Sequence, residues 1–228
     1  NGWSDQASGF EGTAKTDYYN ATSNTWWSDT SLVRARTDIM AGLVGDIAIF
    51  AGGLYGPTIY GDVDIYSYTT KTWSHTQLSI PRKLMSVITL GNKMVIVGGC
   101  SACITYCDGC YASNAVDYYD YTTNIWTSGY YSGSGVVQSL QNDRQPRAAS
   151  IGCKIIVILS NSNSGYIYDS IQTSWTSFIF VLPNTYQTSF SIGNYAIFAK
   201  ISSNGTAVRF SDSALGIFYY ILNIILCR

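Results

Sequence analysis

A segment that occurs four times constrains this chain more than any other feature of its sequence. "VDIYSYTTKTWS" occupies residues 63–74, and a near copy, "VDYYDYTTNIWTS", occupies residues 116–128. Weaker copies, "KTDYYNATSNTWWS" and "SGYIYDSIQTSWTS", end near Trp26 and Trp175. Each copy joins a tyrosine, a polar turn-forming residue, a bend rich in Thr, Ser and Asn, and a tryptophan. Recurrence of this kind predicts a fold built from similar units that stack in chain order.

The spacing of the aromatic anchors indicates the size of each unit. The anchors are Tyr19 and Trp26, Tyr66 and Trp73, Tyr119 and Trp126, and Tyr168 and Trp175. Successive tryptophans are 47, 53 and 49 residues apart, which is the period of a four-stranded propeller blade and longer than that of a leucine-rich repeat. Because each large aromatic side chain buries about 150–250 Å² when it packs, we expect the anchors to be structural.

A second shared stretch precedes each anchor pair and predicts paired strands. "GLVGDIAIFAGG" at 42–53 matches "ITLGNKMVIVGG" at 88–99, and weaker versions occupy 150–160 and 191–200. The turn glycines are Gly45, Gly91, Gly152 and Gly193. A glycine and a polar residue between two apolar runs predict a β-hairpin. The double glycines that end the first two copies, Gly52, Gly53, Gly98 and Gly99, are expected where φ is positive or where backbones approach closely.

Arg36 and Arg82, each nine residues before a turn glycine, complete a pattern that resembles the kelch repeat. The resemblance implies an all-β fold, a β-propeller of four-stranded kelch-like blades that is incomplete or irregularly closed. We expect one domain over residues 1–228. The expected blades are 33–77, 80–129, 144–178 and 185–224, after an outer half-blade at 15–29. The last copy is degenerate, since "VRFSDSALGIF" lacks both anchors.

Composition agrees with a large β core and excludes some classes of partner. Charged residues make up 12% of the 228 residues and aromatic residues 14%, a balance that disfavours disorder and favours stacked sheets. The net charge is −1 and no basic stripe is present in the sequence. Nucleic acid is therefore not an expected partner.

The apolar segment at residues 214–226 bears on membrane association and on closure of the ring. Its length falls short of the roughly 20 residues of a membrane span, so no span is expected. An outer strand of the last blade is favoured over an intermolecular contact or an anchor. We expect the ring to close irregularly, with the N-terminal outer strands joining the C-terminal region, or to leave edges that a second copy covers.

Four cysteines lie in an insertion of seven residues in the second repeat, "CSACITYCDGC". Cys100, Cys103, Cys107 and Cys110 are expected to form disulfides, with three possible connectivities. Zinc held by the same four thiolates and free thiols are the alternatives, although only three residues separate the two Cys pairs, a short spacing for zinc. A buried, unpaired role is favoured for Cys153 over a pairing with Cys227.

Disulfides and a composition rich in Ser, Thr, Asn and Tyr favour an extracellular or cell-surface location. In that setting Asn20 and Asn204, each followed two residues later by threonine, are candidate sites of N-glycosylation. Asn20 also occupies the turn position of the repeat, which explains it without a glycan.

Enzymatic functions find little support in the sequence. The resemblance extends to propeller copper oxidases, but these need two histidines and this chain has only His75, expected to be an ordinary surface residue. Aspartates such as Asp64, Asp117, Asp120 and Asp169 fall at repeat or turn positions, where bonds to the local backbone account for them. We therefore expect neither catalytic residues nor a cofactor.

Two functional classes are favoured by the sequence. The first is an extracellular, non-catalytic interaction module that binds a protein or a glycan through propeller loops, as the resemblance implies. The second is a structural subunit of an extracellular filament or matrix, which low charge, abundant tyrosine and the apolar C-terminal segment suggest. A carbohydrate-active enzyme is the third alternative.

Overall fold

The computed structural model describes residues 13–104, 109–132, 136–141, 145–159, 164–179, 188–192 and 195–199. Every regular element in these ranges is a β-strand, and the largest sheets have four antiparallel strands. The predicted all-β fold of four-stranded blades is confirmed. No helix long and apolar enough to cross a membrane occurs in these ranges.

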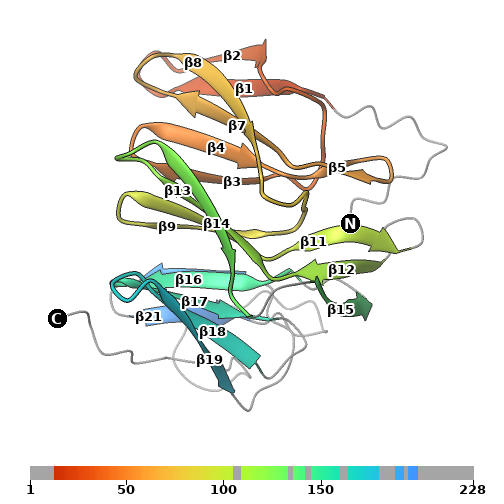
Figure 1. The fold of residues 1–228 in the computed structure, drawn as a ribbon. Coiled ribbons are helices and arrows are strands. Elements are labelled where there is room, and N and C mark those ends of the chain that lie inside the picture. The colour runs from red at the N-terminus through yellow and green to blue at the C-terminus, as the bar shows by residue number, and fades with distance from the viewer. Residues whose placement is uncertain are drawn as a thin grey trace, which may run out of the picture.

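Three complete sheets form the body of the protein, and we call them blades 1, 2 and 3 (Figure 1). Each is a meander in which the first, second, third and fourth strands are neighbours in that order. Blade 1 contains β3 (Met40–Val44), β4 (Ile47–Ala51), β7 (Asp62–Ser67) and β8 (Thr72–Gln77). Blade 2 contains β9 (Ser86–Leu90), β10 (Lys93–Val97), β13 (Ala115–Asp120) and β14 (Ile125–Tyr130). Blade 3 contains β16 (Arg147–Ile151), β17 (Lys154–Ile158), β18 (Ser164–Asp169) and β19 (Ser174–Ile179).

Four smaller elements accompany the blades. The half-blade consists of β1 (Lys15–Asn20) and β2 (Thr25–Thr30), and a further pair consists of β20 (Thr188–Ile192) and β21 (Tyr195–Ala199). A short hairpin of β5 (Leu54–Tyr55) and β6 (Thr58–Ile59) extends from blade 1. A three-stranded sheet of β11 (Cys100–Ile104), β12 (Gly109–Ser113) and β15 (Val136–Gln141) extends from blade 2.

The turn glycines act as the sequence predicts. In each blade two residues join the first and second strands, and the first of them is Gly45, Gly91 or Gly152. All three have φ between 54° and 58°, a conformation that glycine adopts without the steric cost that a side chain brings. Gly193 lies outside the described residues.

The hydrophobic core is divided among the interfaces between blades. One buried cluster, containing Ile49 and Met94, lies between blades 1 and 2, and a second, containing Val95 and Ile155, lies between blades 2 and 3. A third cluster joins Ile156 of blade 3 to Phe198 of β21. Because a four-stranded sheet cannot bury both of its faces alone, each blade depends on its neighbours for its core.

The aromatic anchors face the preceding unit. In every repeat the anchor tyrosine lies directly opposite the anchor tryptophan on the neighbouring strand, and the paired rings are 4.9–5.2 Å apart. Trp126 packs against the first core cluster, which includes Ile49 of blade 1. Trp73 donates a hydrogen bond of 3.0 Å to Tyr18 of the half-blade, and Trp175 donates one of 2.8 Å to Tyr118 of blade 2.

The units therefore stack in chain order, from the half-blade through blades 1, 2 and 3 to β20 and β21 (Figure 1). The described sheets do not close into a ring. The half-blade leaves its anchors open, because Trp26 is 71% exposed and Tyr19 is 49% exposed. The C-terminal segment 214–226 and most of the expected fourth blade lie outside the described residues, so both closure hypotheses stay predictions.

Candidate functional site

Blades 1 and 2 each carry an extension between their second and third strands. After β4 the chain forms the β5–β6 hairpin, and after β10 it forms the β11–β12 hairpin, which β15 later joins. Each extension begins with the same pair of backbone hydrogen bonds. Thr37 and Leu54 exchange two bonds of 2.8 and 2.9 Å, while Lys83 and Cys100 exchange two of 3.0 and 2.8 Å. The two extensions are thus equivalent parts of the repeat, and they leave their blades on the same side (Figure 1).

The double glycines allow the chain to leave each blade. Gly52, Gly53, Gly98 and Gly99 have φ of 65°, 107°, 63° and 97°. A side chain at Gly53 would place its Cβ 2.5 Å from the carbonyl oxygen of Thr37, and one at Gly99 would place it 2.5 Å from that of Lys83. These carbonyls accept the hydrogen bonds that start the extensions, so the glycines fix the position of both extensions.

A buried arginine supports the base of each extension. Arg36 donates to the carbonyl of Gly52 at 2.8 Å and to Asp64 at 2.6 Å. Arg82 donates to the carbonyl of Gly98 at 2.8 Å and also binds Asp117. Both arginine side chains are fully buried.

Burial lowers the pKa of Arg82, and the neighbouring Asp117 carboxylate opposes that shift. A guanidinium stays protonated in proteins, so the ion pair is charged. Arg82 therefore ties the end of β10 to the interior of β13.

The prediction for the aspartates is correct at two positions and wrong at two. Asp120 and Asp169 each accept backbone N–H groups two and three residues ahead, as expected of a turn. Asp64 and Asp117 instead lie within β7 and β13, almost fully buried, where each binds an arginine. The backbone groups that they accept belong to Val33 and Ser79, far away in sequence.

His75 is an exposed residue of the outer strand β8, as the sequence predicted, but it also contacts a buried carboxylate that the sequence did not reveal. Its Nδ1 lies 2.7 Å from Oδ1 of Asp64, and its side chain is 44% exposed. The pairing of strands β7 and β8 could have revealed this contact, because it places His75 directly opposite Asp64. The equivalent positions in the half-blade and in blade 2 place Ser28 opposite Asp17 and Ser128 opposite Asp117. Among the described residues no hydroxyl or thiol forms a hydrogen bond with His75, so the pair lacks the nucleophile of a catalytic triad.

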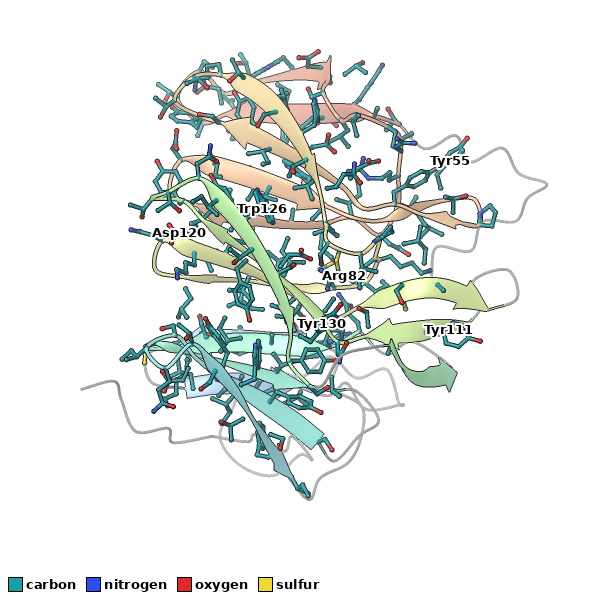
Figure 2. All side chains as sticks on the ribbon, viewed as in Figure 1. Tyr55, Arg82, Tyr111, Asp120, Trp126 and Tyr130 are labelled. Carbon is teal, nitrogen blue, oxygen red and sulfur yellow. The ribbon has the colours of Figure 1, made fainter. Side chains whose placement is uncertain are left out.

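The extensions carry few charged residues, and they present Tyr55 and Tyr111 on a surface that we call the extension surface (Figure 2). β6 of the first extension lies beside β11 of the second. Tyr55 and Tyr111, on the two extensions, are 49% and 40% exposed. At the base of the first extension the guanidinium of Arg34 lies 4.4 Å from the ring centre of Tyr60. Exposed tyrosines are typical of protein-binding surfaces.

Only part of the prediction for the cysteines falls on residues that the structure describes. Cys100 is buried at the start of β11, and both Cys100 and Cys153 are disulfide-bonded, so the unpaired role expected for Cys153 is wrong. In the β11–β12 register Cys103 lies directly opposite Cys110. The side chains of Cys103, Cys107 and Cys110 lie outside the described residues, so the pairing within the insertion stays a prediction, as does the zinc alternative.

The glycosylation candidates also stay predictions. Asn20 lies at the exposed turn between β1 and β2, where its Oδ1 accepts the backbone N–H groups of Thr22 at 2.9 Å and Ser23 at 3.3 Å. This contact provides the structural role that the repeat predicted for Asn20. Asn204 lies outside the described residues.

Comparison with protein families identifies the repeat. Residues 81–129 match the Kelch motif. The match spans blade 2 together with Arg82, the double glycine, Asp117 and Trp126, and blade 1 has the counterparts Arg36, Gly52–Gly53, Asp64 and Trp73. A comparison with curated proteins found no match for the chain.

The kelch match supports a general function. Kelch repeats mediate protein binding in general, and propellers built from them are typically non-catalytic binding modules. Within the described part of the chain no group of three or more His, Cys, Asp or Glu side chains could hold a metal ion.

Proposed function

We propose that the protein is a non-catalytic interaction module that binds a protein partner through the extension surface. One observation carries the proposal, namely that kelch-type blades 1 and 2 place equivalent extensions side by side with Tyr55 and Tyr111 exposed. The double glycines and the buried arginines fix the base of each extension, which positions both extensions relative to their blades.

The partner is expected to be a protein with an uncharged, partly apolar patch. The first extension, residues 53–61, has no charged residue, and the second, residues 100–114, has only Asp108. A strongly acidic or basic partner would find no complementary charge there. Tyrosine supplies contact area at a low cost in conformational entropy and keeps a hydroxyl for hydrogen bonds.

An extracellular or cell-surface location is part of the proposal. Disulfide-bonded Cys100 and Cys153, and an exposed Asn20 followed by a glycosylation-type threonine, support an oxidising compartment. Recognition of a glycan at the same surface is the alternative to protein binding.

Self-assembly into a filament or matrix is a second candidate function. It is favoured by the half-blade, whose Trp26 is 71% exposed although the equivalent tryptophans of blades 1 to 3 pack against a preceding unit. Sedimentation of the purified chain over a range of concentrations measures self-association and tests this function. Self-association through this face should weaken when Trp26 is replaced by serine.

Site-resolved photocrosslinking tests the binding proposal. The photoreactive residue benzoylphenylalanine is placed at Tyr55 or Tyr111, and the protein is irradiated in extracellular fluid that contains the partner. The probe should form covalent adducts with the partner. An excess of wild-type protein should suppress these adducts. The matched control places the probe at Tyr68, which is 68% exposed and belongs to the turn after β7, away from the extensions. An excess of the double variant Tyr55→Lys, Tyr111→Lys should not suppress the adducts. Equal labelling from position 68, or full competition by the double variant, would contradict the proposal.

A further inference from the structure

A cavity of about 390 Å³ lies between the outer strands of blades 2 and 3, apart from the extension surface. Its lining includes Tyr118, Gly129 and Tyr130 from blade 2 and Tyr168 and Trp175 from blade 3. Figure 2 shows Tyr130 at the end of β14, where blade 2 borders blade 3. Its size is at the lower end of the range for small-molecule sites, so it suits a ligand of one ring.

Tyr168 lines this cavity, and its hydroxyl lacks the hydrogen bond that two of its counterparts form. In the half-blade and in blade 2 the equivalent tyrosine donates to an asparagine at the following turn, Tyr19 to Asn24 and Tyr119 to Asn124, both at 2.9 Å. Blade 3 has Thr173 at that turn position, and its hydroxyl donates to the carbonyl of Gln172 instead. Tyr168 is only 6% exposed, and its hydroxyl has no hydrogen-bond partner among the described residues. A phenol without a protein acceptor can donate its proton to an oxygen of a ligand.

Tyr118 adds a second donor. Its oxygen accepts the indole N–H of Trp175 at 2.8 Å, which leaves the hydroxyl proton for another acceptor. Burial raises the pKa of Tyr118 to about 12, so the phenol keeps that proton at neutral pH.

The cavity is open at Gly129 and carries little net charge. A Cβ at Gly129 would meet no heavy atom within 4 Å, whereas blade 1 has a threonine, Thr76, at the equivalent position. The one charged residue of the lining, Lys93, has its ammonium 3.8 Å from the carboxylate of Asp120, which offsets its charge.

From aromatic walls, hydroxyl donors and near-neutral charge we infer that this cavity binds one neutral hexopyranose residue of a glycan. The C–H groups of a pyranose ring pack against aromatic faces, while its oxygens accept hydrogen bonds from Tyr168, Tyr118 and Lys93. The inference goes beyond protein binding at the extension surface, and either site can fail without the other.

Saturation-transfer NMR with a panel of free sugars tests the inference. The purified protein is mixed with millimolar glucose, galactose, mannose or glucuronate, and affinity is measured by titration. At least one neutral hexose should receive saturation through its ring C–H protons. Absence of transfer to every neutral hexose, or transfer to glucuronate alone, would overturn the inference.

Two variants and a control locate the binding. Gly129→Phe fills the open part of the cavity from a strand position that tolerates an aromatic residue, and should weaken binding by about tenfold or more. Tyr168→Phe removes only the hydroxyl and should weaken binding about two- to tenfold. Ser128→Phe adds the same ring to the opposite face of β14 and should leave affinity unchanged.

Circular dichroism confirms that each variant is folded before its affinity is compared. Equal affinity of the wild type and Gly129→Phe would place the sugar elsewhere and contradict the inference. So would an equal loss in Gly129→Phe and Ser128→Phe.

Discussion

Replacement of Gly99 by valine should destabilise the protein by at least about 3 kcal/mol, because two costs add. The backbone φ of 97° is one that a residue with a side chain adopts only with strain. The new Cβ would also lie 2.5 Å from the carbonyl oxygen of Lys83, a backbone atom that pairs with Cys100. Gly53→Val should behave in the same way, since its Cβ would meet the carbonyl of Thr37.

Gly91→Val is the matched control for this prediction. Gly91 also has a positive φ, of 58°, but a Cβ there would meet nothing within 4 Å. Its replacement should cost only the backbone strain, about 1–2 kcal/mol. Urea unfolding of the three variants measures the difference. Equal midpoints for Gly99→Val and Gly91→Val would show that the close approach at the base of the second extension does not exist.

Removal of the buried guanidinium of Arg82 should have the second large effect. Arg82→Met leaves the Asp117 carboxylate buried without its counter-ion, and it frees the carbonyls of Gly98 and Ala115, which Arg82 binds at 2.8 and 2.7 Å. Breaking a buried ion pair by removing one partner costs about 3–5 kcal/mol. The free energy of unfolding, measured in urea, should fall by that amount.

Two further variants separate the ion pair from general effects of the substitution. Arg82→Met combined with Asp117→Leu removes both charges and should recover part of the loss. Lys93→Met breaks the partly exposed pair with Asp120 and should cost no more than about 1 kcal/mol. A loss in Arg82→Met no greater than in Lys93→Met would contradict the role assigned to the buried arginine.

The sequence predicted the blades well because their signals are local and repeat. The turn glycines, the apolar runs beside them and the Tyr–Trp spacing each report on strands that are neighbours in the chain. The double glycines were predicted to need a positive φ or a close approach, and the structure shows both at Gly53 and Gly99. The insertion with the cysteines was predicted in the second repeat, and the structure places it between the second and third strands of blade 2. The β5–β6 hairpin of blade 1 was not predicted.

The candidate sites were harder to predict because they depend on contacts between units. β15 joins the β11–β12 hairpin from more than twenty residues downstream, and no feature of its sequence marks that pairing. The bond between Asp64 and His75 requires the strand register. The cavity depends on Thr173 replacing an asparagine at one turn and on Gly129 replacing a threonine on one strand, departures from the repeat rather than the repeat itself.

The contacts between blades also involve residues beside the anchors. Tyr18 and Tyr118, which accept the bonds from Trp73 and Trp175, precede the anchors Tyr19 and Tyr119 by one residue. Successive residues of a strand face opposite sides of the sheet, so the anchor packs on the preceding unit and its neighbour on the following one. The consecutive tyrosines in the first and third copies of the repeat therefore encode the stacking order.

Double-mutant cycles on these bonds test most directly the central claim that kelch-type units stack in chain order. Trp175→Phe and Tyr118→Phe should be coupled by about 0.5–1.5 kcal/mol in the free energy of unfolding, as should Trp73→Phe and Tyr18→Phe. The mismatched pair Trp73→Phe and Tyr118→Phe should be additive, because those residues belong to different contacts. Coupling in the two matched pairs and none in the mismatched pair is the predicted result; additivity in all three cycles would contradict the stacking of the blades.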